Sequence, residues 1–374
     1  MSTATAPDPV RITGYGVLSA AGVGGKALYE AVRSGALPAG DGGAAALSGA
    51  EPPPLRLLPV PDFSPQEYLG RKGLSSLSRT SALGMAAAGL ALDALSVEEE
   101  PAPHPDTGVV LGTSTGSARA FTEFLRDTYE QRRPYHVSPA LFPGLLLNHA
   151  AGQTAMRHAF TGVNATLAGG HVSSLSALRY ARNALVTGQA ARLLAGGVEE
   201  LSAQSAWAWH RSGVLGRDGA VGEGSAVFVI ERGTHGTTIA ELASCEAGFS
   251  PLEDGPLAAA RALARCIGAA LRAGGARPED VDVVCPGAPC GRGWGAVESR
   301  GRRRALAGHA PEVLRVREVL GETYSAGGGL QLAVLLAHWE ANTAPGTGSW
   351  GLVTSVGSNG SVAAALLRRP SGGI

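Results

Sequence analysis

The stretch TGVNATLAGGHVSSLSALRYARNALVTG, residues 161–188, decides the fold. Residues 164–168 are typical of a strand, the glycines after them are typical of a turn, and residues 172–187 carry apolar side chains at helical spacing. A compact apolar run, ARLLAGGV at 191–198, predicts the next strand. Strands that alternate with helices in this way indicate an α/β fold with largely buried sheets.

The same alternation extends in both directions. Before this stretch we predict strands at 10–17 and 108–112 and helices at 78–95, 119–132 and 144–160. After it, strands at 225–231 and 238–247 are expected to be neighbours in one sheet. The pattern then begins again, and it predicts helices at 256–273, 298–306 and 324–339 and strands at 281–285, 313–317, 351–355 and 362–367. Two successive rounds predict a duplicated unit, with halves at residues 1–233 and 234–374.

The composition argues against several classes of protein. Lys+Arg and Asp+Glu both count 31, so the excess basic charge needed to bind nucleic acid is missing. No apolar run reaches the length of a membrane span, and the start MSTATAPDPV lacks the pattern of a signal peptide. Four cysteines are too few for a disulfide scaffold. We therefore expect reduced thiols in a cytoplasmic protein, with no metal or other cofactor.

The segment GTSTG, residues 112–116, matches the G-x-S-x-G elbow of serine hydrolases and lies between a predicted strand and a predicted helix. On that interpretation Ser114 attacks a carbonyl group, and a later aspartate and histidine complete a triad. The late histidines are poor partners, because His309 lies in a loop of small residues and His338 lies inside an apolar helix. The alternative is a turn whose small residues serve packing.

Two further glycine-rich segments could carry chemistry. In AGGHVSS, residues 168–174, His171 would lie near a helix N-terminus, where it could act as a base, while Ser173 and Ser174 could cap the helix. A packed histidine is the simpler interpretation. The segment SVGSNGS, residues 355–361, could be a loop of backbone donors or a tight turn between two strands.

Taken in order, these segments resemble the β-ketoacyl synthases of the thiolase superfamily. The resemblance is carried by ITGYGVLSAAG, VVLGTSTGS, the stretch at 161–188, LLAGGVEE, GEGSAVFVIE, EDVDVVCPGAPCGRGWGAVESRGRR, GETYSAGGGLQLAVLLAHWE and SVGSNGS, in conserved order over nearly the whole chain. It implies the thiolase fold, an α/β architecture of five layers, αβαβα, built from two similar βαβαβαββ halves. In that family the turn at Ser114 lines the acyl pocket.

The resemblance also implies a catalytic cysteine, two histidines and a lysine, and this chain has none of them. His171 stands where the family's T-A-C-A-S pattern has the cysteine, and Gly287 stands where N-A-H-G-T has the first histidine. Arg317 and Glu322 replace the lysine and the second histidine of K-S-M-T-G-H, whereas Glu298 is retained. A glycine donates no side-chain hydrogen bond, and an ionised glutamate would repel the developing oxyanion. The pattern predicts a chain that keeps the fold and the subunit pairing of the family but does not catalyse the condensation reaction.

Within the family the chain resembles the chain length factor, or KSβ, the inactive subunit of type II polyketide synthases. The run GETYSAGGGLQ is closer to that subunit's G-R-L-Y-x-G-x-G than to the G-H-L-L-G-A-A-G of active enzymes, although His171 departs from its usual glutamine. The resemblance implies a heterodimer with an active ketosynthase, contact with an acyl carrier protein through the pair, and a role in antibiotic biosynthesis.

The same resemblance implies specific surfaces. The dimer face is expected near residues 137–151, and the arginines at 300 and 302–304 could meet an acidic carrier protein or form a solvated helix face. The oxyanion loop would use the backbone of His171 and Val356. The tunnel wall, or else ordinary interface core, is expected at Thr115, Phe121, Phe124, Val137 and Leu141.

Two enzymatic alternatives stay open at this point. His171 could serve as a base or acyl acceptor, or it could promote decarboxylation of a malonyl group. The second alternative is a serine hydrolase at Ser114.

Overall fold

The computed structural model describes residues 9–37, 47, 51–95, 104–215, 219–233, 237–288, 293–342 and 350–370. The strands are β1 Val10–Ser19, β2 Gly22–Val23, β3 Arg56–Leu58, β4 Thr107–Gly112, β5 Asn164–Leu167, β6 Arg192–Glu199, β7 Ala220–Gly222, β8 Gly224–Arg232, β9 Ala240–Phe249, β10 Val281–Cys285, β11 Glu312–Val313, β12 Trp350–Val356 and β13 Ser361–Arg368. The helices are α1 Gly25–Ser34, α2 Pro65–Leu69, α3 Arg79–Asp93, α4 Ala118–Glu130, α5 His149–Arg157, α6 Ser173–Val186, α7 Ala203–Ser212, α8 Gly255–Gly274, α9 Trp294–Ala305, α10 Val316–Leu320 and α11 Gly327–Ala341. Short 3₁₀ turns include η2 Pro139–Leu145, η3 Gly170–Val172, η4 Leu252–Asp254 and η6 Tyr324–Ala326.

Within the described residues, one sheet runs through the molecule in the order β11-β10-β12-β13-β9-β1-β8-β6-β4-β5, with β2 paired to β1. Its two halves have the same arrangement. β1 pairs antiparallel with β8, β8 antiparallel with β6, and the parallel strands β4 and β5 follow. β9 begins the same series with β13, β12, β10 and β11. The halves share one topology, while the boundary between residues 233 and 234 stays a prediction, since residues 234–236 lie outside the described ones.

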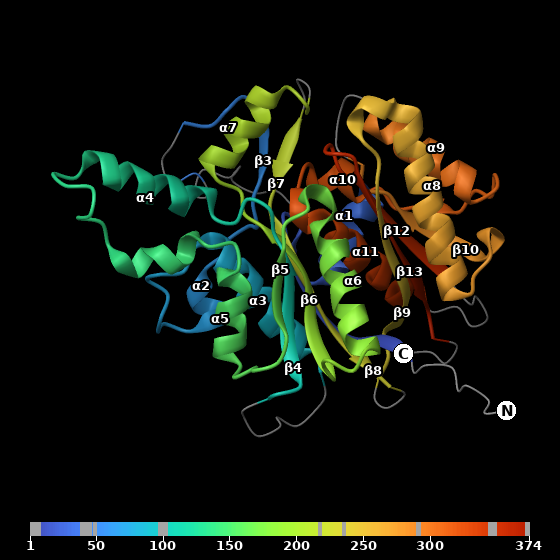
Figure 1. Cartoon of the computed structure of the whole chain (residues 1–374), viewed down its shortest axis with the longest axis horizontal. Helices are drawn as coiled ribbons and strands as arrows, with labels where there is room; N and C mark the ends of the chain where they lie inside the picture. The colour runs from blue at the N-terminus through green and yellow to red at the C-terminus, as the bar shows by residue number, and fades with distance from the viewer. Residues whose placement is uncertain are drawn as a thin grey trace.

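Helices alternate with the two halves of the sheet in layers (Figure 1). α6 and α11 lie between the halves, because α6 contacts β4, β6 and β9 while α11 contacts β8 and β12. α3 covers the outer face of the first half, and α8 covers the outer face of the second, with α9 packed on it. This arrangement produces the expected five layers.

Burial explains why the sequence takes this form. Val110 of β4 belongs to the central cluster with α6 and α11, whereas its neighbours Val109 and Leu111 pack with α3 on the other face. Side chains that alternate between two covered faces are apolar at every position, which is why the strands appear as continuous apolar runs. α11 is buried on nearly all sides and is correspondingly apolar all round.

Three of the predictions made from the pattern are wrong. β8 and β9 are not neighbours, because β1, apolar on both faces, lies between them and pairs with both. The strand expected at 313–317 ends at Val313, and α10 begins three residues later. The helix expected at 144–160 is interrupted, because Leu146 has an extended backbone (φ −81°, ψ 138°): residues 144–145 end the 3₁₀ turn η2, and α5 covers only His149–Arg157.

No helix among the described residues is both long and apolar enough to cross a membrane.

Candidate functional site

The four positions that differ from the family's catalytic residues lie together and are linked by polar contacts. Nε2 of His171, in η3, lies 3.3 Å from Oε2 of Glu322, which follows α10. The guanidinium of Arg317, in α10, donates to the same carboxylate oxygen and, at 3.2 Å, to the carbonyl oxygen of Gly287 after β10. The structure therefore joins His171, Glu322, Arg317 and Gly287 into one continuous chain of contacts, which we call the four-residue network.

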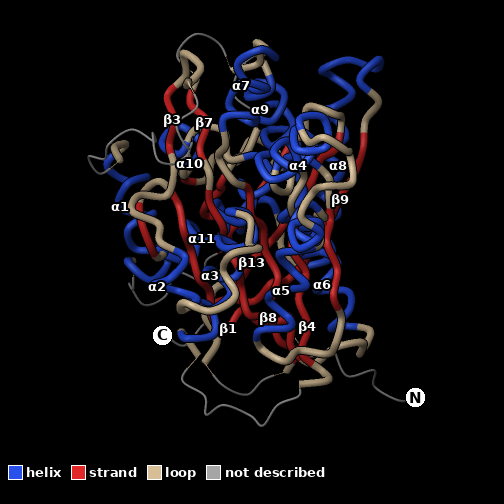
Figure 2. The backbone as a smooth tube through the Cα atoms, turned by 90° about the vertical axis from the view of Figure 1, so that its left-hand side faces the viewer, coloured by secondary structure: helices blue, strands red, loops and turns tan. Residues whose placement is uncertain are grey.

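The backbone of Glu322 is held in place by β7. The N–H of Glu322 donates to the carbonyl of Ala220 at 2.9 Å, and the N–H of Gly222 donates to the carbonyl of Glu322 at 2.9 Å. Figure 2 shows β7 with its partner β3 at the same end of the molecule as α10. The small β3–β7 pair thus positions the carboxylate that lies at the centre of the network.

Electrostatics fix the charge of Glu322. Burial opposes its ionisation, but Arg317, His171 and the backbone N–H of Tyr324, 2.8 Å from Oε1, lower the pKa of Glu322 to about 2. The carboxylate is therefore ionised at neutral pH, and it forms a buried ion pair with Arg317, whose side chain is 12% exposed. A fixed anion thus occupies the position that the resemblance assigns to the family's second histidine.

The ring of His171 is enclosed by two aromatic side chains. Its centroid lies 4.8 Å from that of Tyr324 and 6.0 Å from that of Trp209, and both contacts are edge-to-face. Tyr324 and Trp209 also contact each other, at 5.3 Å. His171 is only 2% exposed as a result, so neither solvent nor a substrate reaches its ring in this conformation. Trp209 belongs to α7, a helix that the sequence did not predict.

The space beside Gly287 is filled by the side chain of Gln331 from α11. A Cβ at Gly287 would lie 2.4 Å from Oε1 of Gln331, closer than real contacts allow. Nε2 of Gln331 donates to the carbonyls of Cys285 at 2.7 Å and Thr354 at 3.1 Å, so the amide cannot easily move aside. A histidine at position 287 therefore requires the amide of Gln331 to move away, with loss of these hydrogen bonds.

Glu298, the glutamate that the family's motif also has, connects the loop after β10 to β12. Its carboxylate accepts hydrogen bonds from the backbone N–H of Gly287 at 3.0 Å, from that of Ala288 at 2.8 Å and from the hydroxyl of Thr354 at 2.6 Å. These bonds hold the loop after β10 against β12 and keep the carbonyl of Gly287 facing Arg317.

Ser114 has serine and backbone partners. Its Oγ lies 2.9 Å from Oγ of Ser173 and accepts a hydrogen bond from the N–H of Gly170 at 2.8 Å. Neither Ser173 nor Ser174 caps α6, so that prediction is wrong: Ser173 donates to the carbonyl of Gly170, and Ser174 donates to that of Ser325. These hydroxyls fasten the turn before α6 to the adjacent segments.

The predicted oxyanion loop lies close to η3. Oγ of Ser355 donates to the carbonyl of His171 at 2.8 Å, which brings the end of β12 against the start of α6. The segment that follows Val356 is a tight turn between β12 and β13, in which the N–H of Gly357 donates to Ser361 at 2.7 Å. A role for His171 and Val356 in holding an oxyanion stays a prediction.

The thiols described by the structure are poor substitutes for the missing nucleophile. Cys245, Cys266 and Cys285 are free and buried. Burial raises the pKa of each thiol, that of Cys266 to about 12, so none is a thiolate at neutral pH. Cys290 lies outside the described residues. Among the described residues no cluster of histidine, cysteine, aspartate or glutamate could hold a metal ion.

The predicted tunnel residues lie on or beside an arm formed by α4 and η2. α4 extends away from the sheet and has no buried residue (Figure 1). Phe124 contacts Phe142 of η2 edge-to-face at 6.2 Å. Thr115 hydrogen bonds to the buried Glu199 before the arm begins. The exposed apolar residues of this arm are Phe121, Leu125, Tyr129, Leu141 and Phe142, and Val137 precedes η2.

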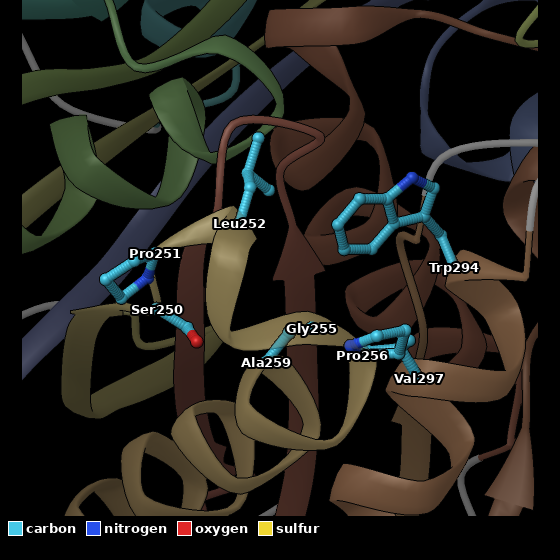
Figure 3. Close-up of a pocket in the computed structure, with 8 residues that line it drawn as sticks. All are labelled: Ser250, Pro251, Leu252, Gly255, Pro256, Ala259, Trp294 and Val297. Atoms are coloured by element: carbon cyan, nitrogen blue, oxygen red, sulfur yellow. The ribbon is translucent and has the colours of Figure 1, made fainter.

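A separate apolar pocket of about 270 Å³ lies between the starts of α8 and α9 (Figure 3). Trp294 and Leu252 project into it, and Pro256 and Val297 form its base. Among the described residues none that lines it is charged, and none belongs to the four-residue network.

Two matching half-sheets around a pair of buried central helices, with His171 at the start of one of them, define a condensing-enzyme scaffold of the thiolase fold. The chain belongs to the β-ketoacyl synthase family, whose N-terminal domain model matches residues 7–235.

Several members of the family are similar to this chain over most of its length. It is 28% identical to the actinorhodin polyketide putative beta-ketoacyl synthase 2 of Streptomyces coelicolor, over 93% of this chain and 89% of the relative. It is also 28% identical to a putative polyketide beta-ketoacyl synthase 2 of Streptomyces halstedii, over 92% and 88%. Among solved structures, the ishigamide ketosynthase/chain length factor superposes with a TM-score of 0.80 at 34% identity, covering 96% of this chain and 99% of that one.

Proposed function

We propose that this chain is a non-condensing subunit of the chain-length-factor type, which pairs with an active ketosynthase in the cytoplasm and sets the length of a polyketide. The observation that carries the proposal is the four-residue network. It fills the place of a condensing site with an ion pair buried beneath two aromatic rings.

The chemistry of the network supports the absence of condensation. Acyl transfer needs an accessible nucleophile, whereas the ring of His171 is enclosed and tied to Glu322. Decarboxylative condensation develops an oxyanion, which the ionised carboxylate of Glu322 would repel. Gly287 offers no side-chain donor, and Gln331 occupies the adjacent space. The fold of the family is retained, whereas the side chains that acyl transfer and condensation require are missing.

The unpartnered surfaces support pairing. The α4–η2 arm exposes large apolar side chains, with Phe121 50% and Phe142 54% exposed, and such a patch on a soluble scaffold marks an interface. β5 forms the end of the sheet and leaves one edge unpaired among the described strands. Solved relatives are described as a ketosynthase/chain length factor and, at 17% identity, as an acyl-carrier protein in complex with its ketosynthase. By analogy we expect a ketosynthase to cover the arm and a carrier protein to visit the pair.

The proposal is tested by co-expressing this chain with an active ketosynthase of a type II polyketide synthase. We expect the two to co-purify as a heterodimer that elongates malonyl groups on a carrier protein, whereas neither chain does so alone. His171→Phe, which keeps the aromatic packing, should leave the rate of the pair unchanged, and replacement of the partner's nucleophilic cysteine should abolish it. Condensation by this chain alone would contradict the proposal.

One observation favours the enzymatic alternative. The contact between His171 and Glu322 is a histidine–carboxylate pair of the kind that tunes a base. If His171 promotes decarboxylation, His171→Phe will lose malonyl decarboxylation by the pair. Ser114→Ala tests the hydrolase interpretation. If Ser114 is the nucleophile, this substitution will abolish labelling of the protein by an acyl substrate.

Phe124→Ala is expected to lengthen the products of the pair. Phe124 is partly buried and packs against Phe142, so its truncation opens space in the predicted tunnel wall. Tyr129→Ala is the matched control, because Tyr129 lies further along α4 and is 87% exposed. Mass spectrometry of the products measures chain length. An unchanged product spectrum with Phe124→Ala and with substitutions at Thr115, Phe121, Val137 and Leu141 would exclude this tunnel wall.

A further inference from the structure

A cavity of about 340 Å³ lies between α9 and α10 and is lined in part by Arg317. Three arginines line it: Arg302 from α9, Arg315 immediately before α10, and Arg317 in α10. Ser299 adds a hydroxyl group to the lining. Guanidinium groups from two elements thus converge on one concave space.

Arg302 lacks the partner that a partly buried guanidinium normally has. Its Nε is buried and has no hydrogen-bond acceptor among the described residues. Burial lowers the pKa of Arg302, Glu298 opposes this effect, and the neighbouring charge of Arg315 adds to it. An arginine that faces a second arginine in a cavity is costly unless an anion lies between them.

The carboxylates that line the cavity are already engaged. Glu298 accepts its hydrogen bonds from two backbone N–H groups and Thr354. Glu318 is exposed and contacts Arg315 at 3.6 Å, a distance and exposure that make the pair weak. Neither glutamate hydrogen bonds to Arg302, which lines the cavity with its Nε lacking an acceptor among the described residues.

We infer that this cavity binds a small phosphate-class oxyanion, held by Arg302 and Arg315 with Ser299 as a neutral donor. Planar guanidinium groups suit a tetrahedral oxyanion because each can donate two parallel hydrogen bonds. The anion is either inorganic phosphate or the phosphate of a small monoester, and the cavity volume admits both. The site does not depend on the pairing proposed above.

The position of Arg317 couples the cavity to the four-residue network. Its guanidinium lines the cavity and also donates to Glu322 and Gly287. An anion near Arg317 would share its donors with Glu322, so occupancy of the cavity and the strength of the buried ion pair are linked.

The test measures phosphate binding by the full chain, alone or with its co-purified partner, by calorimetry at constant ionic strength. Inorganic phosphate is the first probe, glycerol 3-phosphate the second, and chloride the non-specific control. We expect Arg302→Gln to weaken phosphate binding about tenfold or more, since it removes charge-assisted hydrogen bonds. Arg300→Gln is the matched control, because Arg300 is an exposed arginine on the same helix that does not line the cavity.

The relative affinities for the two probes show which anion the cavity binds. Tighter binding of glycerol 3-phosphate than of phosphate identifies a monoester, and the reverse identifies the free ion. Arg302→Lys keeps the charge but loses the planar fork, so it should bind more weakly than the wild type if Arg302→Gln fails to fold. Equal phosphate affinity in the wild type, Arg302→Lys and Arg300→Gln would overturn the inference, as would the absence of binding to the wild type.

Discussion

Glu322→Ala is expected to destabilise the folded chain by about 3–5 kcal/mol, the usual cost of removing one member of a buried ion pair. The substitution leaves Arg317, which is 12% exposed, without its carboxylate. It also removes the acceptor of the Tyr324 N–H and the contact of His171. Urea unfolding at neutral pH, followed by circular dichroism, measures the change in the free energy of unfolding.

Glu318→Ala is the control for this prediction. Glu318 lies four residues earlier, its side chain is 69% exposed, and its contact with Arg315 is expected to contribute at most about 1 kcal/mol. The pH dependence adds a second check. The folded pKa of Glu322, about 2, lies below its unfolded value, so the stabilisation is present above pH ~4.3 and is lost as the pH falls towards 2. A Glu322→Ala effect that equals the Glu318→Ala effect would contradict the network.

Glu200→Gln is expected to flatten the loss of stability between pH 5 and 8. Burial raises the pKa of Glu200 to about 7, even though Thr80, Ser117 and the N–H of Arg119 donate to its carboxylate. A carboxyl group with a raised folded pKa stabilises the protein fully below its unfolded pKa, and this contribution is lost as the pH rises through 7. The shift corresponds to about 3 kcal/mol at pH 8 and above, whereas a glutamine stays neutral throughout.

The experiment compares unfolding free energies of Glu200→Gln and wild type at several pH values from 5 to 8. Glu253→Gln, at an exposed position in η4, is the control and should leave the slope unchanged. The variant is compared with the wild type at each pH because burial also raises the pKa of the adjacent Glu199, which contributes to the slope in both proteins. Parallel curves for Glu200→Gln and wild type would show that Glu200 is ionised throughout this range.

The sequence predicted the parts of the fold that depend on local periodicity. The run at residues 172–187 corresponds to α6, Ser173–Val186. The apolar run at 191–198 corresponds to β6, Arg192–Glu199, a buried strand that pairs with β4. It could not predict that β1 separates β8 from β9, because strand order depends on contacts far apart in the chain. The four network positions were found through the family's motifs, which carry residue positions but no information on which side chains meet.

The partners of the site were missed for a physical reason. Trp209 and Gln331 are helical residues, and only the packing of α7 and α11 brings them to His171 and Gly287. A glutamine in the otherwise apolar helix GGGLQLAVLLAHWE was a usable signal, because a buried amide must find hydrogen-bond partners. Trp209 offered no comparable signal.

Gln331 has a consequence for how this chain can change over generations. A mutation that placed a histidine at position 287 would bring its Cβ to 2.4 Å from the Gln331 amide, so the glutamine side chain would have to move. A smaller residue at position 331 would remove the hydrogen bonds to the carbonyls of Cys285 and Thr354, and this loss would lower the stability of the fold. A histidine at position 287 alone would therefore lower the stability of this chain unless position 331 changed with it.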